Sequence, residues 1–530
     1  MHRRIAKGLA VVVAAATVAV TPAVTGASAS PGAETATAAR ITWAPCGTTD
    51  PQGVRAECGL LDVPLDYSRP NGRKIQIAVS RIRSTAPAKD YQGVILALPG
   101  GPGNSGLCTS ADCVPASVGD AYDWIGFDPR GVGSSVPALS CDKDYLNGPR
   151  PEYVPWSRSI EQTWLDRSKS YADACRVAGG ALLDHMTTLD TVKDVESIRK
   201  ALGVGRVNLY GISYGTYLGQ VYGTLYPKTV RRMVLDSNID PRRVWYQAAL
   251  DQDVNLERNL RMWFEWVAKH DDVYHLGKTT NQVRQRWYAK QNNLRTAPAG
   301  GVVGPAEFTD IFIIAGYFQF IWPTLAELFA SSVTDPEAEL LVAAYESSFR
   351  PANDNTFAAF NAVQCTDTRW PRSWNTWRRD NWRTFGSAPF ATWYNVWYNA
   401  PCLFWPGKVS KPVEVDGSKV ESVLFVSGTL DALTPFEGSL EARRRFPNGS
   451  LLAEIGQTTH VNSFNGSPCI TSAIADYLAT GELPRRKPGN QPDATCDAPP
   501  QPDPTPSSPQ ASSPGVGDAA VLAPLHAVRR

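Results

Sequence analysis

Gly211-Ile212-Ser213-Tyr214-Gly215 is the only Gly-X-Ser-X-Gly stretch in the 530 residues of the chain. The preceding residues 207–212 read as a strand, and residues 216–226 read as a helix that ends before Pro227. A tight strand–turn–helix needs these glycines, because larger side chains would collide with the neighbouring strand and helix. The turn sets the serine hydroxyl at a helix N-terminus, which favours developing negative charge. Ser213 is therefore the candidate nucleophile.

The segments around this turn alternate between strands and helices. Continuous apolar runs predict buried strands, and Asp190–Leu202 carries apolar residues at helical spacing before Gly203. An Asn71-Gly72 turn before alternating apolar residues predicts an antiparallel hairpin at the start of the sheet. The expected fold class is α/β with a mostly parallel central sheet. The runs that predict buried strands are Val94–Leu98, Trp124–Phe127, Met233–Leu235, Val423–Val426 and Leu451–Ile455.

The alternation fails over a long segment rich in tryptophan, which predicts a large, mainly helical lid inserted into one sheet. Beyond Cys496 the chain offers little to bury. The expected organisation is a signal peptide at 1–29, the first part of the core at 30–240, the lid at 241–413, the second part of the core at 414–496 and a disordered Pro/Ser-rich tail at 497–530.

The N-terminus has the pattern of an export signal. Basic residues precede the apolar run Leu9–Val20, and Ala27-Ser28-Ala29 forms a small-residue cleavage site. The run is shorter than the roughly 20 residues of a membrane-spanning helix. We expect a secreted, extracellular protein that begins near Ser30, with a twin-arginine signal at Arg3-Arg4 as an alternative route.

The ten cysteines favour disulfides, because an exported chain meets an oxidising compartment. Zinc binding is the alternative, but the chain has no Cys-X-X-Cys pair. Pairing in chain order closes five local loops, and we expect this order. The expected pairs are Cys46–Cys58, Cys108–Cys113, Cys141–Cys175, Cys365–Cys402 and Cys469–Cys496.

Bulk charge gives no reason to expect a polyanionic partner. The 52 Lys and Arg residues nearly balance the 51 Asp and Glu residues, so neither nucleic acid nor an anionic membrane surface would be attracted. A small or neutral partner is expected.

A serine nucleophile needs a base, and in the order Ser, acid, His the base comes late in the chain. Of the six histidines, His460 is the one that follows a core strand beyond Ser213. Asp431 directly follows the preceding strand and is the expected acid, which would hold the imidazole tautomer without taking the proton. Asp236, at the end of an earlier strand, remains the competing acid.

A tetrahedral intermediate also needs two N–H donors. The residue after the nucleophile, Tyr214, supplies one. The glycine loop after the strand at 94–98 supplies the other, with Gly101 as the first choice and Gly100 as the fallback, because Pro102 has no N–H. The alternative for this loop is a plain turn.

Several of these elements together resemble the secreted bacterial tripeptidyl aminopeptidases, relatives of proline iminopeptidase, over about Trp43 to Cys496. The elements are Leu98-Pro99-Gly100-Gly101-Pro102-Gly103, Asp128-Pro129-Arg130-Gly131-Val132-Gly133-Ser134, Gly211-Ile212-Ser213-Tyr214-Gly215-Thr216, Val234-Leu235-Asp236 and Asp431-Ala432-Leu433-Thr434-Pro435. The resemblance implies the α/β-hydrolase fold and release of short peptides from a free N-terminus through an acyl-enzyme, without metal or cofactor.

Two positions depart from the relatives' pattern. Proline iminopeptidases carry a histidine where this chain has Pro99, and Thr459 precedes His460 in place of the usual glycine. The same family includes chains named as carboxylesterases, so an esterase with the same three residues is the alternative activity. A non-catalytic binding protein on the same fold is a third possibility.

The expected substrate is a peptide with a free N-terminus, and the expected protein is a monomer. An aminopeptidase must pair the substrate ammonium with a desolvated acid. Glu265, Asp367 and Glu346 are candidates in or near the lid, and none of them is distinguished by spacing.

Overall fold

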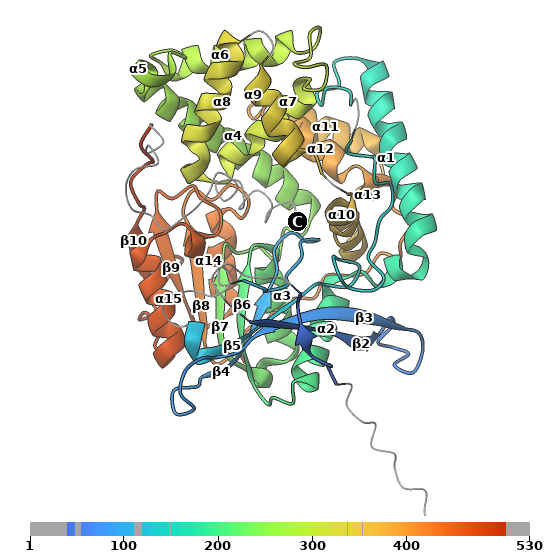
Figure 1. The fold of residues 1–530 in the computed structure, drawn as a ribbon, viewed down its shortest axis with the longest axis vertical. Helices are drawn as coiled ribbons and strands as arrows, with labels where there is room; N and C mark the ends of the chain where they lie inside the picture. Colours follow the sequence, from blue (N-terminus) through green and yellow to red (C-terminus); the bar gives the residue numbers. More distant parts are fainter. Residues whose placement is uncertain are drawn as a thin grey trace, which may run out of the picture. The chain divides into compact units, whose positions relative to one another are not determined.

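The structure, a computed structural model, describes residues 40–47, 55–110, 119–147, 150–335, 338–351 and 353–504 (Figure 1). The predicted signal peptide, Cys113 and residues 505–530 of the predicted tail lie outside the described residues.

The strands of the described chain form a single sheet in the order β1-β2-β3-β5-β4-β6-β7-β8-β9-β10. Pairing is antiparallel from β1 to β5 and parallel from β5 through β4 to β10. The predicted mostly parallel α/β sheet is therefore confirmed. The strands are β1 (Ala44–Pro45), β2 (Ala56–Pro64), β3 (Lys74–Ile82), β4 (Gly93–Leu98), β5 (Tyr122–Phe127), β6 (Val207–Ile212), β7 (Val230–Asp236), β8 (Val423–Gly428), β9 (Gly449–Ile455) and β10 (Ala494–Asp497).

Some helices outside the predicted lid begin after residues whose side chains satisfy free backbone N–H groups. Thr187 accepts a hydrogen bond from the N–H of Asp190 at the start of α2, and Ser467 does the same for Ile470 at α15. The helices outside the predicted lid are α1 (Arg158–Gly179), α2 (Thr188–Ala201), α3 (Tyr214–Leu225), α14 (Phe436–Arg445) and α15 (Pro468–Thr480), with short turns at η2 (Gly119–Ala121), η3 (Gly180–His185), η4 (Pro227–Thr229) and η8 (Asn462–Phe464).

The described residues between 241 and 413 form helices and no named strand. They run through α4 (Tyr246–Lys269), α5 (Asp271–Tyr274), α6 (Thr280–Asn293), α7 (Pro305–Phe312), η5 (Ile313–Gly316), η6 (Gln319–Ile321), α8 (Trp322–Thr334), α9 (Glu339–Ala344), η7 (Tyr345–Phe349), α10 (Asn355–Asp367), α11 (Trp374–Phe385), α12 (Thr392–Asn399) and α13 (Pro401–Phe404). Figure 1 shows these helices over one edge of the sheet.

Tryptophan packing divides these helices into two groups. Trp263, Trp287 and Trp322 lie in an apolar cluster formed mainly by the helices from α4 to α9. Trp393 and Trp397 belong instead to the main core, where the Trp397 ring stacks on Trp164 of α1 at 5.6 Å. Helix α1 therefore packs with the second group, although it precedes the nucleophile in sequence.

Four of the predicted disulfides are present, namely Cys46–Cys58, Cys141–Cys175, Cys365–Cys402 and Cys469–Cys496. Cys108 is buried, and its predicted partner Cys113 lies outside the described residues, so that pair stays a prediction. Among the described helices, none combines the length and apolar character needed to cross a bilayer.

The chain after β10 contacts the lid. The indole N–H of Trp266 in α4 donates to Pro502 O at 3.1 Å, and the Tyr274 hydroxyl of α5 donates to Pro504 O. Ordered structure thus extends to residue 504, beyond residue 497, where we expected the disordered tail to begin.

Candidate active site

Ser213 stands on a sharp turn between β6 and α3. Its φ is +52° and its ψ is −123°, a conformation that costs a non-glycine residue free energy and that clusters at functional sites. A Cβ on Gly211 would come within 2.5 Å of Gly215 O, and a Cβ on Gly215 would overlap Leu98 O. The close approach of α3 to β6 explains Gly211, and its close approach to the end of β4 explains Gly215.

His460 and Asp431 are in direct contact. The Nδ1 atom of His460 lies 2.8 Å from Asp431 Oδ2, and both side chains are buried. Asp431 also accepts hydrogen bonds from the N–H groups of Leu433 and Thr434 and from the Thr434 hydroxyl. Burial acts to raise the pKa of Asp431, but the His460 side chain and the Thr434 donors outweigh burial and hold the pKa below its usual value.

Asp236, the competing acid, faces backbone groups instead of the imidazole. Its carboxylate accepts hydrogen bonds from Asn462 N at 3.1 Å and from Ser463 N at 2.7 Å. The neighbouring Ser237 hydroxyl accepts one from Val461 N at 2.9 Å. Burial raises the pKa of Asp236, and these bonds oppose it. The geometry thus pairs the histidine with Asp431 and leaves Asp236 to hold the loop that follows His460.

The lid also holds the loops of Asp431 and His460 through hydrogen bonds in which at least one partner is a backbone group. His460 N donates to Tyr317 O at 2.7 Å, and Gln319 N donates to the Thr459 hydroxyl at 3.1 Å. From α4, the Asn259 amide donates to Leu430 O at 3.0 Å, beside Asp431. Sequence reasoning missed these supports because each involves a backbone group, which leaves no residue signature.

Tyr214 and the glycine loop at Gly100 supply candidate N–H donors beside Ser213. Tyr214 is the first residue of α3, so no carbonyl of that helix occupies its N–H. Gly101 has a φ of +107°, and a Cβ placed on Gly100 would lie 3.4 Å from the Cβ of Ser213. Gly100 is therefore close to the candidate nucleophile, Gly101 is its neighbour in the chain, and the choice between them stays open.

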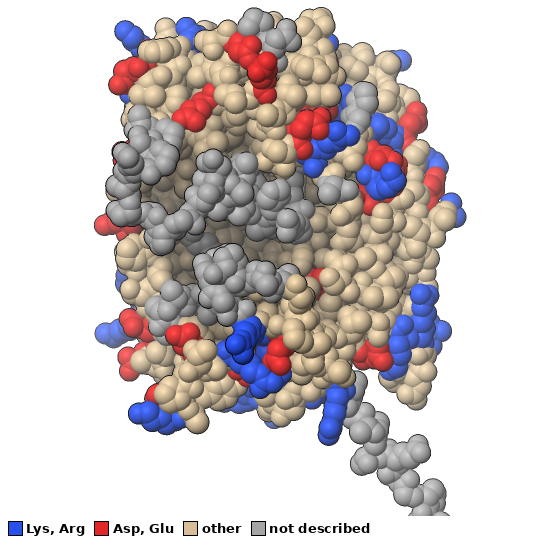
Figure 2. All heavy atoms as spheres, viewed as in Figure 1, with Lys and Arg blue, Asp and Glu red and all other residues tan. Residues whose placement is uncertain are grey.

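Ser213 and His460 line the same cavity, whose volume is about 1970 Å³. Core loops supply one wall and the lid supplies the other, with Ile314, Tyr317 and Phe360 among the lid residues. The volume exceeds the roughly 300–1,000 Å³ of ordinary small-molecule pockets, which leaves room for several residues of a peptide. In the view of Figure 2 the surface is hollowed between the lid and the sheet, and charges of both signs are scattered around the hollow.

A buried cluster of ionic groups forms part of the cavity wall. Arg150 contacts Asp310 at 2.7 Å and Glu307 at 3.0 Å, and all three side chains are at most 5% exposed. Tyr153 donates its hydroxyl proton to Asp310 at 2.7 Å. Asp310 and Arg150 line the cavity directly. Burial raises the pKa of Glu307, although Arg150 opposes this effect. Two carboxylates thus share one guanidinium.

None of the three lid acids named from the sequence lines this cavity. Glu265 and Glu346 are exposed and pair with Lys269 and Arg350 on the surface. Asp367 is buried and bonded within the protein. Glu307 and Asp310 were missed because their spacing indicates only the first turns of a helix, where Glu307 accepts from Gly304 N as a capping residue.

Comparison with known proteins places this geometry in a family. The family model described as the alpha/beta hydrolase fold matches residues 93–467. The chain is 41% identical over 471 residues to tripeptidyl aminopeptidase of Streptomyces coelicolor, with 86% of each chain covered. It is 29% identical to serine protease Hip1 of Mycobacterium bovis, with 84% of this chain and 89% of that protein covered.

A third relative carries a different activity in its name. The chain is 30% identical to carboxylesterase B of Mycobacterium tuberculosis over 495 residues, which cover 87% of this chain and 93% of that protein. The fold, the turn at Ser213, the Asp431–His460 contact and these similarities point to one class of enzyme. The chain belongs to the α/β-hydrolase family and, within it, to the serine hydrolases related to the tripeptidyl aminopeptidases.

Proposed function

We propose that this enzyme is a secreted serine exopeptidase that releases short peptides, chiefly tripeptides, from free N-termini through an acyl-enzyme on Ser213. The observation that carries the proposal is the acid-rich cluster of Arg150, Glu307 and Asp310 in the wall of the cavity that holds Ser213. The similarity to tripeptidyl aminopeptidase supports the length of the released peptide.

The proposed reaction uses Ser213, His460 and Asp431 in the roles of nucleophile, base and orienting acid. The Ser213 hydroxyl attacks the scissile carbonyl carbon while His460 Nε2 takes its proton, and Asp431 stabilises the resulting imidazolium through Nδ1. The N–H of Tyr214 and that of Gly101 or Gly100 stabilise the oxyanion. His460 then protonates the leaving amine, and water hydrolyses the acyl-enzyme by the same steps in reverse order.

The ionic cluster suits recognition of the substrate ammonium. When all three groups are ionised, the cluster carries one negative charge in excess, and burial makes an uncompensated charge costly. A substrate ammonium beside Asp310 would supply the missing positive charge. An acetylated N-terminus cannot do so, and the loss of this contact should cost about 2–4 kcal/mol, or roughly 30- to 1000-fold in kcat/KM.

Three substrates test the proposal. The measurement is kcat/KM for a tripeptide anilide, for its N-acetylated form and for a short-chain acyl ester. We expect the free peptide to be preferred by roughly 30-fold or more over the blocked peptide. Equal rates on the two peptides together with faster ester cleavage would favour the esterase alternative, which the similarity to carboxylesterase B suggests.

Variants of the ionic cluster provide a second test of the proposal. Asp310→Asn and Glu307→Gln should lower kcat/KM for the free peptide and leave ester cleavage near the wild-type rate, which also shows that the variants are folded. Glu265→Gln is the matched control, because Glu265 is an exposed lid acid paired with Lys269. A variant that loses peptide and ester cleavage equally would contradict a role of its carboxylate in amine recognition.

Export and oligomeric state are tested on protein from the culture medium. We expect the secreted chain to begin near Ser30 and to be a monomer. N-terminal sequencing and light scattering coupled to gel filtration would measure both properties. A chain retained with residues 1–29 attached would contradict cleavage of the signal.

A further inference from the structure

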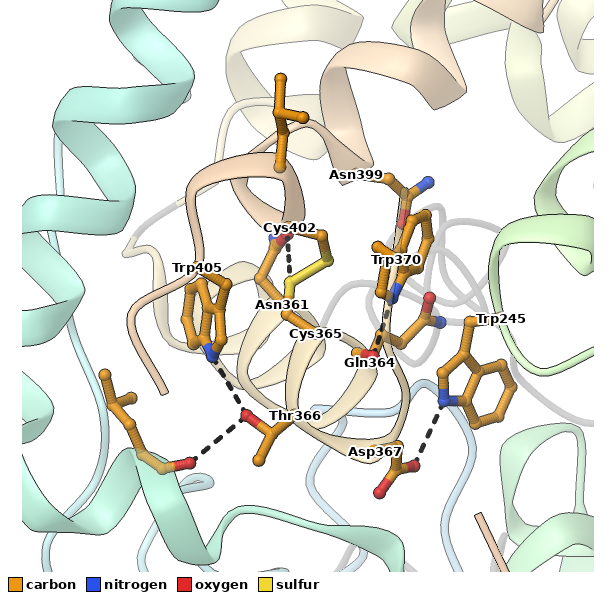
Figure 3. The surroundings of a disulfide bond; sticks show 12 residues. Trp245, Asn361, Gln364, Cys365, Thr366, Asp367, Trp370, Asn399, Cys402 and Trp405 are labelled. Carbon is orange, nitrogen blue, oxygen red and sulfur yellow. Dashed lines mark hydrogen bonds between the residues drawn. A yellow bond between two sulfur atoms is a disulfide. The ribbon is translucent and has the colours of Figure 1, made fainter. Parts of the chain in front are cut away.

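Asp367 is the last residue of the lid helix α10, and its side chain contacts the core. It is only 4% exposed. Its Oδ1 atom accepts a hydrogen bond from Thr188 N at 2.7 Å, and its Oδ2 atom accepts one from the Thr188 hydroxyl at 2.6 Å and one from the Trp245 indole N–H at 3.2 Å. Figure 3 shows the Trp245 contact. The carboxylate is thus shared between the first residue of α2 and the start of the lid.

The bonds continue from Thr188 to the residue beside the candidate nucleophile. The Thr188 hydroxyl lies 2.9 Å from the hydroxyl of Tyr214. Thr188 has one hydroxyl proton, and a carboxylate is the stronger acceptor, so the short bond to Asp367 takes this proton. The Tyr214 hydroxyl must then donate to Thr188. Burial raises the pKa of Tyr214 well above its usual value, which keeps this donor protonated.

The ring of Tyr214 has a second contact that depends on the same carboxylate. It packs against Trp245 with ring centroids 6.0 Å apart, and the Trp245 indole is bonded to Asp367. Both the hydroxyl and the face of Tyr214 are therefore held by groups that Asp367 orients.

Asp367 is itself firmly anchored. The adjacent Thr366 hydroxyl accepts a hydrogen bond from the Trp405 indole at 3.0 Å, and the Cys365–Cys402 disulfide ties α10 to α13 (Figure 3). The Ser410 hydroxyl donates to Asp367 O at 3.1 Å. The position of the Asp367 carboxylate is therefore set by its covalent and hydrogen-bonded neighbours and does not depend on the contact between Tyr214 and Thr188.

Tyr214 follows Ser213 directly, and its backbone N–H is the proposed oxyanion donor. Ser213 is held at a φ of +52°, a conformation that persists only where the surroundings over-determine it. We infer that Asp367 is a positioning residue that acts through Thr188 and Trp245 to fix Tyr214, and through Tyr214 the nucleophile turn. This inference rests on the proposed roles of Ser213 and Tyr214, and it assigns to a lid residue a part in the chemistry of the core.

Substitutions along the series of hydrogen bonds test this role. Thr188→Val removes the hydroxyl at nearly constant shape, whereas Thr188→Ser keeps it. Because small displacements of catalytic groups cost up to about 100-fold, we expect Thr188→Val and Asp367→Asn to lower kcat on a tripeptide anilide by roughly 10- to 100-fold. KM should change by less than about threefold, since substrate binding is untouched. Thr188→Ser should retain most of kcat.

Tyr214→Phe provides the mildest variant, because it removes one oxygen atom and keeps the ring. Like Thr188→Val, it should lower kcat. The variant that combines Tyr214→Phe with Thr188→Val should be no worse than the more impaired single variant, because both side chains belong to the same series of hydrogen bonds. Glu346→Gln, an exposed lid acid paired with Arg350, is the control that should match wild type.

The rate of labelling of Ser213 by a fluorophosphonate separates failure of this inference from failure of the proposed function. An unlabelled wild-type Ser213 would contradict the proposed function itself. The positioning role alone would be overturned if Ser213 is labelled in the wild type and if three variants are labelled and turn over at the wild-type rate. These variants are Thr188→Val, Asp367→Asn and Tyr214→Phe. Equal losses in Thr188→Ser and Thr188→Val would overturn it as well.

Discussion

Asp236 ends β7 and Asp431 follows the neighbouring strand β8, and both carboxylates are buried, yet their hydrogen-bond donors differ. Asp431 contacts an imidazole, whose charge changes during the proposed reaction, whereas Asp236 contacts the fixed N–H groups of Asn462 and Ser463. The two residues should therefore respond differently to the same substitution.

We expect Asp431→Asn to lower kcat by about four orders of magnitude, the loss seen when the orienting acid of a serine hydrolase is removed. Asp236→Asn should act mainly on stability, because an amide turns an N–H toward backbone donors and loses charge-assisted bonds worth about 1.5–3 kcal/mol each. The measurements are kcat and urea unfolding of both variants. If Asp236→Asn lowered kcat more than Asp431→Asn, with both proteins folded, the acid role would belong to Asp236.

Ser213→Ala and His460→Ala should each be folded and lose catalysis by several orders of magnitude, because nucleophile and base act as one unit. The double variant should be little worse than either single variant, since the losses are not additive. Steady-state rates and melting curves provide the measurement. Activity within about tenfold of wild type in either variant would reject the assignment.

The pKa of Asp367 gives a prediction about stability. Burial raises this pKa from 3.8 to about 6, against the hydrogen bonds of Thr188. An acid with a raised folded-state pKa stabilises the fold below its unfolded pKa, and this contribution is lost as the pH rises through the folded pKa. Between pH 4 and pH 7, the free energy of unfolding of the wild-type protein should therefore fall by about 3 kcal/mol relative to that of Asp367→Asn. Urea unfolding across this range measures the difference, and a constant difference would contradict the shift.

At the scale of elements, the lid and the core share the candidate site. The segment between η5 and η6 contacts the loop of His460, α4 contacts the turn before Asp431, and α10 contacts the start of α2. The lid therefore supports the loops of Asp431 and His460 as well as lining the cavity. The segment after β10 adds a further connection, because its carbonyls accept hydrogen bonds from Trp266 and Tyr274 of the lid.

Truncation tests that last connection. A chain ending at residue 497 loses the acceptors of Trp266 and Tyr274, and we expect the free energy of unfolding to fall by about 1–3 kcal/mol. A chain ending at residue 504 keeps both acceptors and is the matched control. Thermal melting of the two truncated proteins measures the effect. Identical melting temperatures would show that these contacts contribute no stability.

At the scale of the whole molecule, each observed disulfide connects residues 12 to 37 positions apart. Loops of this length confer about 3–4 kcal/mol each by restricting the unfolded chain. The bonds join residues at the sheet edge, at α1, in the lid helices α10 and α13 and at the C-terminal strand.

We expect mass spectrometry of the non-reduced, secreted protein to find ten paired cysteines in chain order, including Cys108–Cys113. Reduction should lower the melting temperature, because the unfolded chain regains conformational freedom. A control with blocked free thiols before unfolding detects any cysteine that never paired. One free thiol per molecule would contradict full pairing.

The fold class and the four observed disulfides were predictable from the sequence because they depend on local patterns. The apolar runs that form β4, β6 and β8 are recognisable without knowing their neighbours. The pairs Cys141–Cys175 and Cys365–Cys402 are neighbours in chain order. His460 and Asp431 were identified in the same way, each by its place after a strand, and the structure brings them into contact.

The sequence by itself thus determined the glycines around Ser213. Gly211 is needed because of backbone crowding within five residues, whereas the need for Gly215 also depends on its close approach to Leu98 of β4. Only the tertiary structure decided which acids face the cavity and which acid touches which loop. Asp310 meets Arg150 across 160 positions, and Asp367 meets Thr188 across 179. Such contacts depend on how helix faces from distant segments pack together. The same local sequence pattern can therefore place an acid on a solvated helix face or beside a cavity. Only the packing of distant segments decides which charged groups surround the acid.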